Sequence, residues 1–172
     1  MLPPPSGQFA SHNELLAHVR AFARTQGYAV TVKRSRTDAK GEIKNVTMRC
    51  DRGGSYRNRL NLTADSRRRQ TASRLLDCPF ELFGTRRNDV WYLKIRNSEH
   101  NHEVSEDMSG HPIARRLNTE QQEQVRQMSA AGSQPRQILS TIRQSDSSSM
   151  AISRTIYNTL YSIRQERLDG RP

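Results

Sequence analysis

Four side chains of this chain could together bind a metal ion. They are Cys50, Cys78, His100 and His102, which include both cysteines and two of the five histidines. A structural zinc ion takes four thiolate or imidazole ligands in a tetrahedron, and two cysteines with two histidines complete such a set. The intervening stretches of 27, 21 and 1 residues place the ligands on separate segments, which a folded sheet must bring together. The pattern predicts one structural zinc ion and leaves open two buried thiols beside a solvated histidine pair.

The histidine pair lies in SEHNHE, residues 98–103, soon after the strand-like stretch DVWYLKIR. Because side chains alternate between the two faces of a strand, His100 and His102 at the end of such a strand share one face. The other histidines, His12, His18 and His111, fall outside this pattern and are predicted to be surface residues.

A helix followed by four strands is predicted to position the ligands. Residues 11–27 begin with Ser11 and Glu14 at the spacing of a capping box and end at Gly27. β-Branched or alternating runs then predict strands over 28–36, 42–50, 73–84 and 90–102, with turns at TDAKG (37–41) and TRRND (85–89). Cys50 ends the second strand and Cys78 lies inside the third. The Arg-rich residues 51–72 show neither periodicity and are predicted to form a long loop, mobile when unbound.

The character of the chain changes after residue 107. Residues 108–116 contain Gly110 and Pro112 and are predicted to be a linker. Apolar residues at helical spacing then predict three helices, over 117–131, 135–144 and 151–168. Such a set is typical of a helix-turn-helix unit, and a small bundle that packs against a partner or dimerises is an equal alternative.

The charge of the chain is strongly positive and unevenly distributed. The formal net charge is +11, from 28 Lys and Arg against 17 Asp and Glu. Residues 28–102 hold 17 Lys and Arg against 8 Asp and Glu, whereas residues 103–172 hold 9 against 8. A field concentrated in one segment favours a polyanionic partner, and nucleic acid before a membrane, because no amphipathic anchor accompanies it.

Several classes of protein are disfavoured by the same sequence. The N-terminal stretch MLPPPSGQFASHNE has neither a basic start nor an apolar run, so no signal peptide or membrane span is predicted. A reducing compartment is expected, which argues against a disulfide between the two cysteines. The carboxylates are scattered among basic residues, and no paired set suited to acid–base chemistry is visible, so no enzyme is predicted.

The order of several short motifs resembles a known family. MRCDRGG, then LLDCPFEL, then VWYLKIRNSEHNHEV, preceded by the helix and GYAVTVKRSR, is similar to the far-red-impaired-response DNA-binding domain. That domain belongs to the WRKY–GCM group of zinc-binding sheets in Mutator-like transposases and transcription factors derived from them. The resemblance covers about residues 11–104, and the rest is similar to the helical segment before the catalytic domain of fungal Mutator-like transposases. The WRKY heptad itself is absent.

The resemblance implies an α+β fold: an N-terminal helix and a small antiparallel, zinc-binding, WRKY–GCM-like β-sheet, followed by a three-helix, helix-turn-helix-like segment. The expected organisation is a flexible tail over residues 1–10, a zinc-binding DNA-binding domain over 11–107, a linker over 108–116 and a helical segment over 117–172. The single zinc ion would be held by Cys50, Cys78, His100 and His102.

Candidate DNA contacts follow from the resemblance together with the charge. In the WRKY group the strand that enters the DNA groove follows the first helix. The matching strand in this chain carries Lys33, Arg34 and Arg36. Strand alternation places Lys33 and Arg34 on opposite faces, so only one of them would point into the groove. The long loop and its borders supply cations predicted to contact phosphate: Arg49, Arg52, Arg57, Arg59, Arg67, Arg68 and Arg69. The run at 67–69 is equally compatible with a nuclear-import signal or a solvated loop.

The sequence therefore predicts a nuclear, zinc-dependent protein that binds duplex DNA, either a transposase-derived transcription regulator or the N-terminal DNA-binding part of a Mutator-like transposase. A homodimer through the C-terminal helices is one interpretation of that segment. An RNA-binding or protein-interaction module with a structural zinc is the alternative function, and an inactive transposase remnant is a third. Low aromatic content, 6% of the chain, disfavours single-stranded nucleic acid.

Overall fold

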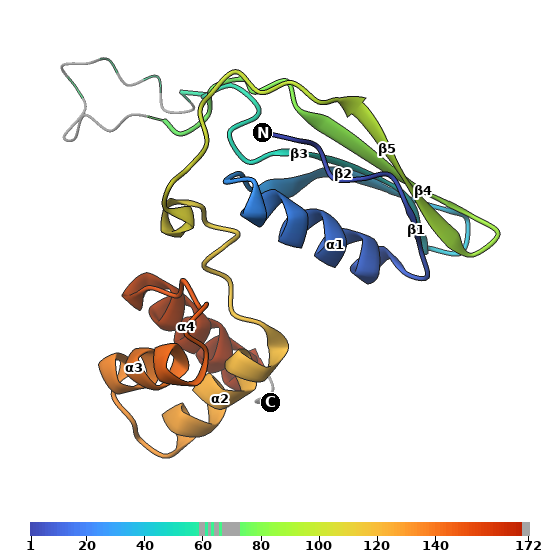
Figure 1. The fold of residues 1–172 in the computed structure, drawn as a ribbon. Coiled ribbons are helices and arrows are strands. Elements are labelled where there is room, and N and C mark those ends of the chain that lie inside the picture. The colour runs from blue at the N-terminus through green and yellow to red at the C-terminus, as the bar shows by residue number, and fades with distance from the viewer. Residues whose placement is uncertain (59–60, 62, 64–65, 67–72, 170–172) are drawn as a thin grey trace. The chain divides into compact units, whose positions relative to one another are not determined.

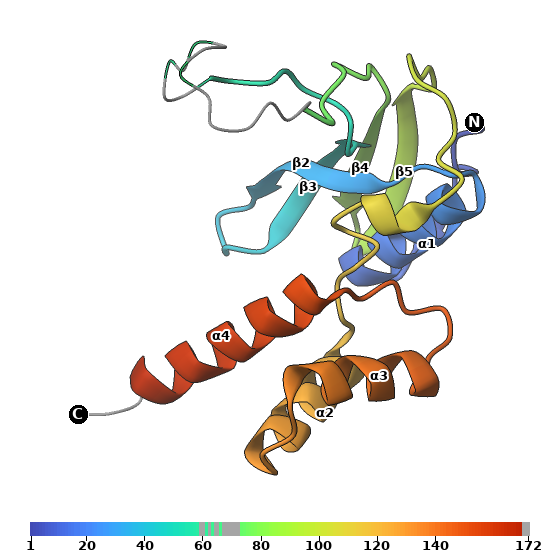
Figure 2. The ribbon, with the colours of Figure 1, turned by 90° about the vertical axis from the view of Figure 1, so that its left-hand side faces the viewer.

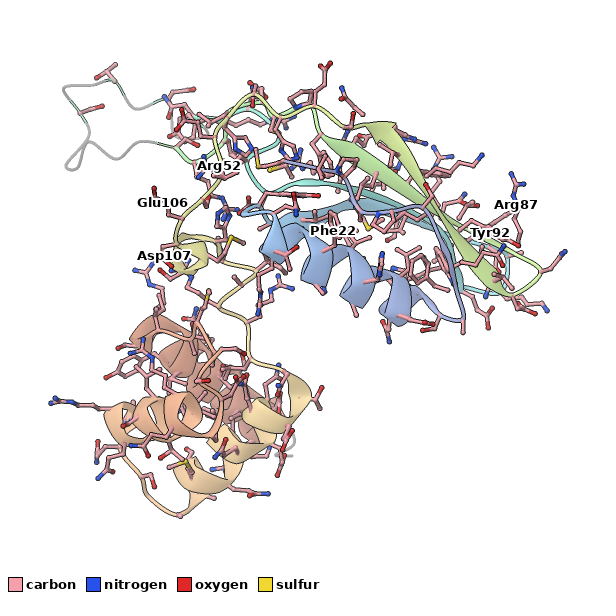
Figure 3. All side chains as sticks on the ribbon, in the orientation of Figure 1. Phe22, Arg52, Arg87, Tyr92, Glu106 and Asp107 are labelled. Atoms are coloured by element: carbon pink, nitrogen blue, oxygen red, sulfur yellow. The ribbon has the colours of Figure 1, made fainter. Side chains whose placement is uncertain are left out.

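The computed structural model describes residues 1–58, 61, 63, 66 and 73–169. The chain divides into two compact units, Met1–Glu106 and Asp107–Pro172, and the two residues at the boundary are labelled in Figure 3. The predicted α+β fold is confirmed: one helix, a five-stranded antiparallel sheet and three C-terminal helices (Figure 1). No helix in the described part of the chain has both the length and the apolar character needed to cross a membrane.

Helix α1, His12–Thr25, begins and ends at capping residues expected from the sequence. The Ser11 hydroxyl accepts a hydrogen bond from the backbone N–H of Glu14, and the Glu14 carboxylate accepts one from the N–H of Ala10. Gly27 has φ of +70°, the left-handed conformation that favours glycine after a helix. Leu15, Leu16, Val19 and Ala23 are buried against the sheet, so α1 covers one of its faces (Figure 2).

The sheet has the order β1-β5-β4-β3-β2, and all neighbouring strands are antiparallel. The strands are β1 (Gln8–Phe9), β2 (Val30–Thr37), β3 (Ile43–Cys50), β4 (Glu81–Arg87) and β5 (Val90–Asn97). One face, here called the helix face, packs Val46, Met48 and Leu82 against α1. Gly84 makes this contact close, because a Cβ there would lie 2.7 Å from a Val46 methyl carbon and 3.3 Å from Leu15.

Strand β2 is an edge strand with an interrupted register. Val32 pairs with Met48 and Arg34 with Thr47, so Lys33 is the extra residue of a β-bulge. The face of the sheet that α1 does not cover is here called the outer face. The pairing of the strands places Arg34 on this face, and the Lys33 ammonium also lies there, 2.6 Å from the Glu81 carboxylate. The prediction that Lys33 and Arg34 point to opposite faces is therefore wrong, because the bulge breaks the alternation. Val32 is 40% exposed, so packing holds only the start of β2.

Two predicted strand boundaries were also wrong. The strand expected over 73–84 begins only at Glu81, because Asp77 adopts φ of +53° and interrupts the extended chain. It then runs through Thr85–Arg87, which had been expected to form a turn. The actual turn is only Asn88–Asp89, with φ of +48° and +59°, as in the two-residue type I′ turns that suit hairpins. Strand β5 ends at Asn97, three residues before His100.

The predicted flexible tail does not hold for its last residues. Gln8 pairs with Tyr92 and Phe9 with Trp91, which adds β1 to the sheet edge. Phe9 is buried in the core, and the Tyr28 hydroxyl donates a hydrogen bond to the carbonyl of Leu2 at 2.9 Å. A single buried ring and one strand contact thus order a segment that has no strand periodicity.

The second unit contains η1 (Met108–Gly110), α2 (Thr119–Ala130), α3 (Pro135–Ser145) and α4 (Ser153–Asp169). Asn118 and Gln121 form a capping box at the start of α2, and Pro135 opens α3. The residues expected to form an open linker include the short helix η1, and Met108 and His111 are buried. The core of the unit consists of Leu117, Val125, Ile138, Ile142, Ala151, Ile156 and Ile163.

Candidate metal centre and basic sheet

The four predicted ligands lie together at one end of the sheet. One atom from each of Cys50, Cys78, His100 and His102 lies within 4.8 Å of all the others. Cys50 Sγ is 3.3 Å from His102 Nε2, Cys78 Sγ is 3.4 Å from His100 Nδ1, and the two ring nitrogens are 3.4 Å apart. Tetrahedral zinc with thiolate and imidazole ligands separates its ligand atoms by roughly 3.3–3.8 Å. The cluster is consistent with a zinc site.

The histidines present the nitrogen atoms that a metal ion requires. His102 Nδ1 lies 2.9 Å from the carbonyl oxygen of Glu103, so this nitrogen carries the proton and Nε2 has the free lone pair. That lone pair faces His100 Nδ1 at 3.4 Å. At this distance the lone pair can bind a cation shared with the His100 ring, and without a cation it can accept a hydrogen bond from that ring. The His100 ring is held by Phe80, stacked at 4.3 Å, and by Tyr28 at 4.6 Å.

The ligands come from backbone that is mostly irregular. Cys50 is the last residue of β3, whereas Cys78 precedes β4, and both histidines follow β5. The prediction that Cys78 lies inside a strand was wrong, as was the prediction that the histidines end one. The histidines nevertheless converge, because the backbone N–H of Ser105 donates to Gly27 and the Asn101 amide donates to the carbonyl of Leu76.

A tight turn after Cys50 holds the second cysteine. The N–H of Gly53 donates to the carbonyl of Cys50 at 2.9 Å, and the N–H of Leu76 donates to the carbonyl of Arg52 at 2.8 Å. A Cβ on Gly53 would lie 2.9 Å from the Cys50 carbonyl oxygen and 3.1 Å from that of Cys78. Only glycine therefore fits where the two cysteine segments meet. Gly53 is the first glycine of the motif MRCDRGG, and the sequence alone did not show why glycine is required there.

The electrostatics of the site favour a bound cation. Burial raises the pKa of the Cys50 thiol to about 12, and the neighbouring Cys78 and Asp51 act in the same direction. Burial also lowers the pKa of His100 to about 4, with the adjacent His102 contributing. The imidazole is therefore neutral at physiological pH and the thiol is uncharged without a metal. A dication reverses the cost of ionising the thiols, because it neutralises two thiolates.

Of the remaining histidines, which were predicted to be surface residues, His111 is buried and His12 and His18 are half-buried. His111 is 4% exposed, and the Nε2 atoms of His12 and His18 are buried without a hydrogen-bond partner in the described part of the chain. The His12 ring packs 5.1 Å from Trp91, and that of His18 packs 4.9 Å from Phe9. Helical periodicity cannot reveal this burial, because β1 and the start of β5 cover that side of α1.

The outer face of the sheet is rich in Lys and Arg side chains, of which some form ion pairs and others do not. Glu81 accepts hydrogen bonds from Lys33 at 2.6 Å and from Arg96 at 2.9 Å, and these bonds lower its pKa. The Arg96 guanidinium also lies 4.1 Å above the Phe83 ring. Arg34 and Arg36, by contrast, are exposed and form no ion pair with any residue that the structure describes. Two free guanidinium groups thus remain on the edge strand.

The other predicted DNA contacts have different surroundings. Arg49 lies beside Gly54, and Arg57 is exposed. Arg52 is used structurally, because its guanidinium donates to the Ser105 hydroxyl at 2.9 Å. Figure 3 shows Arg52 and Arg87 at opposite ends of the sheet. The predicted contacts that lie outside the described residues are Arg59, Arg67, Arg68 and Arg69.

Comparison with known proteins agrees with this site. The profile of the FAR1 DNA-binding domain matches residues 18–106, just over half of the chain, and this span contains all four cluster residues. The chain therefore belongs to the FAR1 DNA-binding domain family, which confirms the resemblance seen in its motifs.

One curated relative extends over nearly the whole chain. A protein of Chaetomium globosum named PKS-NRPS hybrid synthetase cheA is 30% identical over 167 residues. The match covers 94% of this chain but 3% of the synthetase. No solved structure matches the chain.

Proposed function

We propose that this chain is a zinc-dependent protein that binds duplex DNA in the nucleus, as a transposase-derived regulator or as the DNA-binding part of a Mutator-like transposase. The observation that carries the proposal is the four-residue cluster inside the FAR1 match. Membership of that family implies DNA binding. The match to the synthetase contributes no activity, because the chain spans 3% of that protein.

Zinc in this proposal is structural. Cys50, Cys78 and the two histidines would fill all four positions, which leaves no open position for a reacting water. A closed site joins the end of β3, the segment before β4 and the segment after β5. The ion would thus bind the histidine segment to the two cysteine segments, and metal binding would be coupled to folding.

Base reading is assigned to β2, through Arg34 and Arg36. Arginine recognises guanine edges in the major groove, which is wide enough for strands. Both side chains are exposed, share the outer face and lack competing carboxylates among the described residues. Lys33 shares this face but is engaged by Glu81. Arg49 and Arg57 would contact phosphate, and the sequence alone supports the same role for Arg59 and Arg67–Arg69.

The RNA-binding or protein-interaction alternative has less support. Unpaired bases stack on exposed aromatic rings, and the outer face offers Phe83 and Tyr92. Arg96, however, covers the Phe83 ring. The resemblance supports a transposase origin. The arginine run at 67–69 fits a nuclear-import signal and so supports a nuclear location.

The test of the function is a selection from random duplex DNA, with and without a chelator. We expect one enriched motif that disappears when the metal is removed. Competition between that duplex and single-stranded RNA then separates the two functions. Binding that the RNA displaces and the duplex does not would contradict the proposal.

The assignment of β2 is tested with Arg34→Ala and Arg36→Ala on the preferred and a scrambled duplex. Each should cost about 1–3 kcal/mol on the preferred duplex and much less on the scrambled one. Arg87→Ala, which removes an exposed arginine at the end of β4, is the matched control. Equal losses on both duplexes would mean that β2 contacts only phosphate.

A further inference from the structure

The second unit has a small net charge that conceals a strong separation of charge. Half of its six described acidic residues gather at one place: Glu120, Glu123 and Asp146 line a groove between the start of α2 and the end of α3. Glu166 is paired with Arg126 at 2.7 Å. The other described arginines of the unit form no ion pair with any described residue.

Two further grooves border the first turns of α4, and both are basic. One, of about 590 Å³, is lined by Arg136, Arg143 and Tyr157. The other, of about 330 Å³, is lined by Arg115, Arg116 and Arg154. Among the described residues, no Asp or Glu lines either groove. We call these five arginines, with the α4 surface between them, the α4 basic surface.

The arginines of this surface are available to a ligand. Arg115, Arg116, Arg136 and Arg154 form no side-chain hydrogen bond or ion pair with any described residue. Arg143 donates two hydrogen bonds to the carbonyl of Ala151, at 3.2 and 2.8 Å, which fixes its guanidinium while leaving further N–H groups. Hydroxyl and amide groups between the arginines add neutral donors, among them Ser153, Thr155 and Asn158.

We infer that the α4 basic surface is a second contact surface for duplex DNA. This inference rests on the proposed function, since it assigns the same ligand to the helical unit. An α-helix fits the major groove, and phosphates line both sides of that groove. Helix α4 has cations on both of its sides in the same way. Asn158, exposed on α4, is the residue type that pairs with adenine in two hydrogen bonds.

Charge distinguishes this ligand from a second copy of the chain. Tyr157 and Tyr161 are 59% and 62% exposed on α4, and such rings suit a protein interface. A symmetric dimer through this surface, however, would bring the arginines of one copy against those of the other. Like charges brought together in this way oppose association, whereas phosphates compensate them.

The test uses the full chain and the salt dependence of its affinity for duplex DNA. Arg136→Gln with Arg154→Gln removes one charge from each groove. The control, Arg126→Gln with Arg167→Gln, removes two charges from residues that line neither groove. We expect the slope of log affinity against log salt to become shallower by about 2 in the first variant and to stay near the parent value in the control. Equal slopes for the two variants would overturn the inference.

Further measurements keep the outcomes distinct. If the first variant does not fold, as judged by circular dichroism, Arg115→Gln with Arg116→Gln tests the same surface and should also flatten the slope. Sedimentation that shows a dimer disrupted by Tyr157→Ser, with an unchanged slope in the arginine variants, would also overturn the inference. A parent chain that fails to bind any duplex contradicts the proposed function itself. Binding that depends on Arg34 and Arg36 but not on the α4 basic surface contradicts only this inference.

Discussion

At the scale of single residues, Gly53 carries more constraint than its type suggests. It lies where the Cys50 and Cys78 segments approach most closely, with two carbonyl oxygens within 3.1 Å of the position a Cβ would occupy. A methyl group there must displace one of the two ligand segments. The effect would therefore appear first in metal binding and only then in overall folding.

We expect Gly53→Ala to destabilise the first unit by about 1–3 kcal/mol, the usual cost of overpacking, and to weaken its hold on zinc. Competition with a chromogenic chelator measures the second effect. Gly110→Ala is the control, because a Cβ at that position would meet nothing within 4 Å. Equal zinc affinity in the two variants would show that the backbone can move aside.

The ligand assignment has its own test at this scale. Cys78→Ser and His102→Gln should each abolish stoichiometric zinc, because each removes one of four ligands from a closed set. His18→Gln, which changes a histidine packed on Phe9 outside the cluster, should retain one zinc per chain. Elemental analysis of the purified proteins decides the result. A parent chain without zinc would refute the assignment directly.

At the scale of elements, Glu81 separates the cations of the outer face into two groups. It engages Lys33 from β2 and Arg96 from β5, while Arg34 and Arg36 form no ion pair with any described residue. The carboxylate also opposes the approach of phosphate. The balance between general affinity and base preference should therefore depend on this one residue.

Glu81→Gln should tighten binding to all duplexes and reduce the preference for the selected motif, because it releases two cations and removes one negative charge. Glu42→Gln is the matched control. Glu42 lies in the turn after β2 and also pairs with an arginine, Arg86, at 2.6 Å. Isotherms on the preferred and scrambled duplexes measure both effects. An unchanged ratio of the two affinities in Glu81→Gln would contradict the expectation.

Element by element, the sequence predicted the structure where a pattern is local. Helix α1, the β2–β3 hairpin and the three C-terminal helices follow from periodicity and capping residues. The bulge at Lys33 and the positive φ of Asp77 could not be predicted, because pairing partners from distant strands determine them. The four residues predicted to bind zinc lie together despite the wrong strand boundaries, because they were chosen by residue type and not by strand position. The burial of His111 and the α4 basic surface depend on packing that no linear pattern shows.

At the scale of the whole molecule, the two units are stabilised differently. The first combines an apolar core with the cluster of Cys50, Cys78, His100 and His102, whereas the second has its own core of seven buried residues and no such cluster among its described residues. Removal of the metal should therefore act on one unit only.

With a chelator, we expect the first unit to unfold at a lower temperature while α2, α3 and α4 keep their transition. Calorimetry should show two transitions, and circular dichroism at 222 nm should retain the helical signal of the second unit. The Cys78→Ser chain without chelator should behave in the same way. One transition that shifts as a whole would mean that the units fold as one.

The edge position of β2 has a consequence for solubility. Among the described residues, strand β2 pairs with β3 alone, so its other edge presents backbone groups that another chain could pair with. The bulge at Lys33 and the charges of Arg34 and Arg36 are the devices by which natural sheets discourage such pairing. In a cell, bound DNA would cover this edge. In the unbound protein, the repulsion between the arginines of two copies would prevent pairing at this edge. Replacing both arginines with valine should thus produce a chain that forms sheet-rich aggregates, a loss separate from any change in recognition.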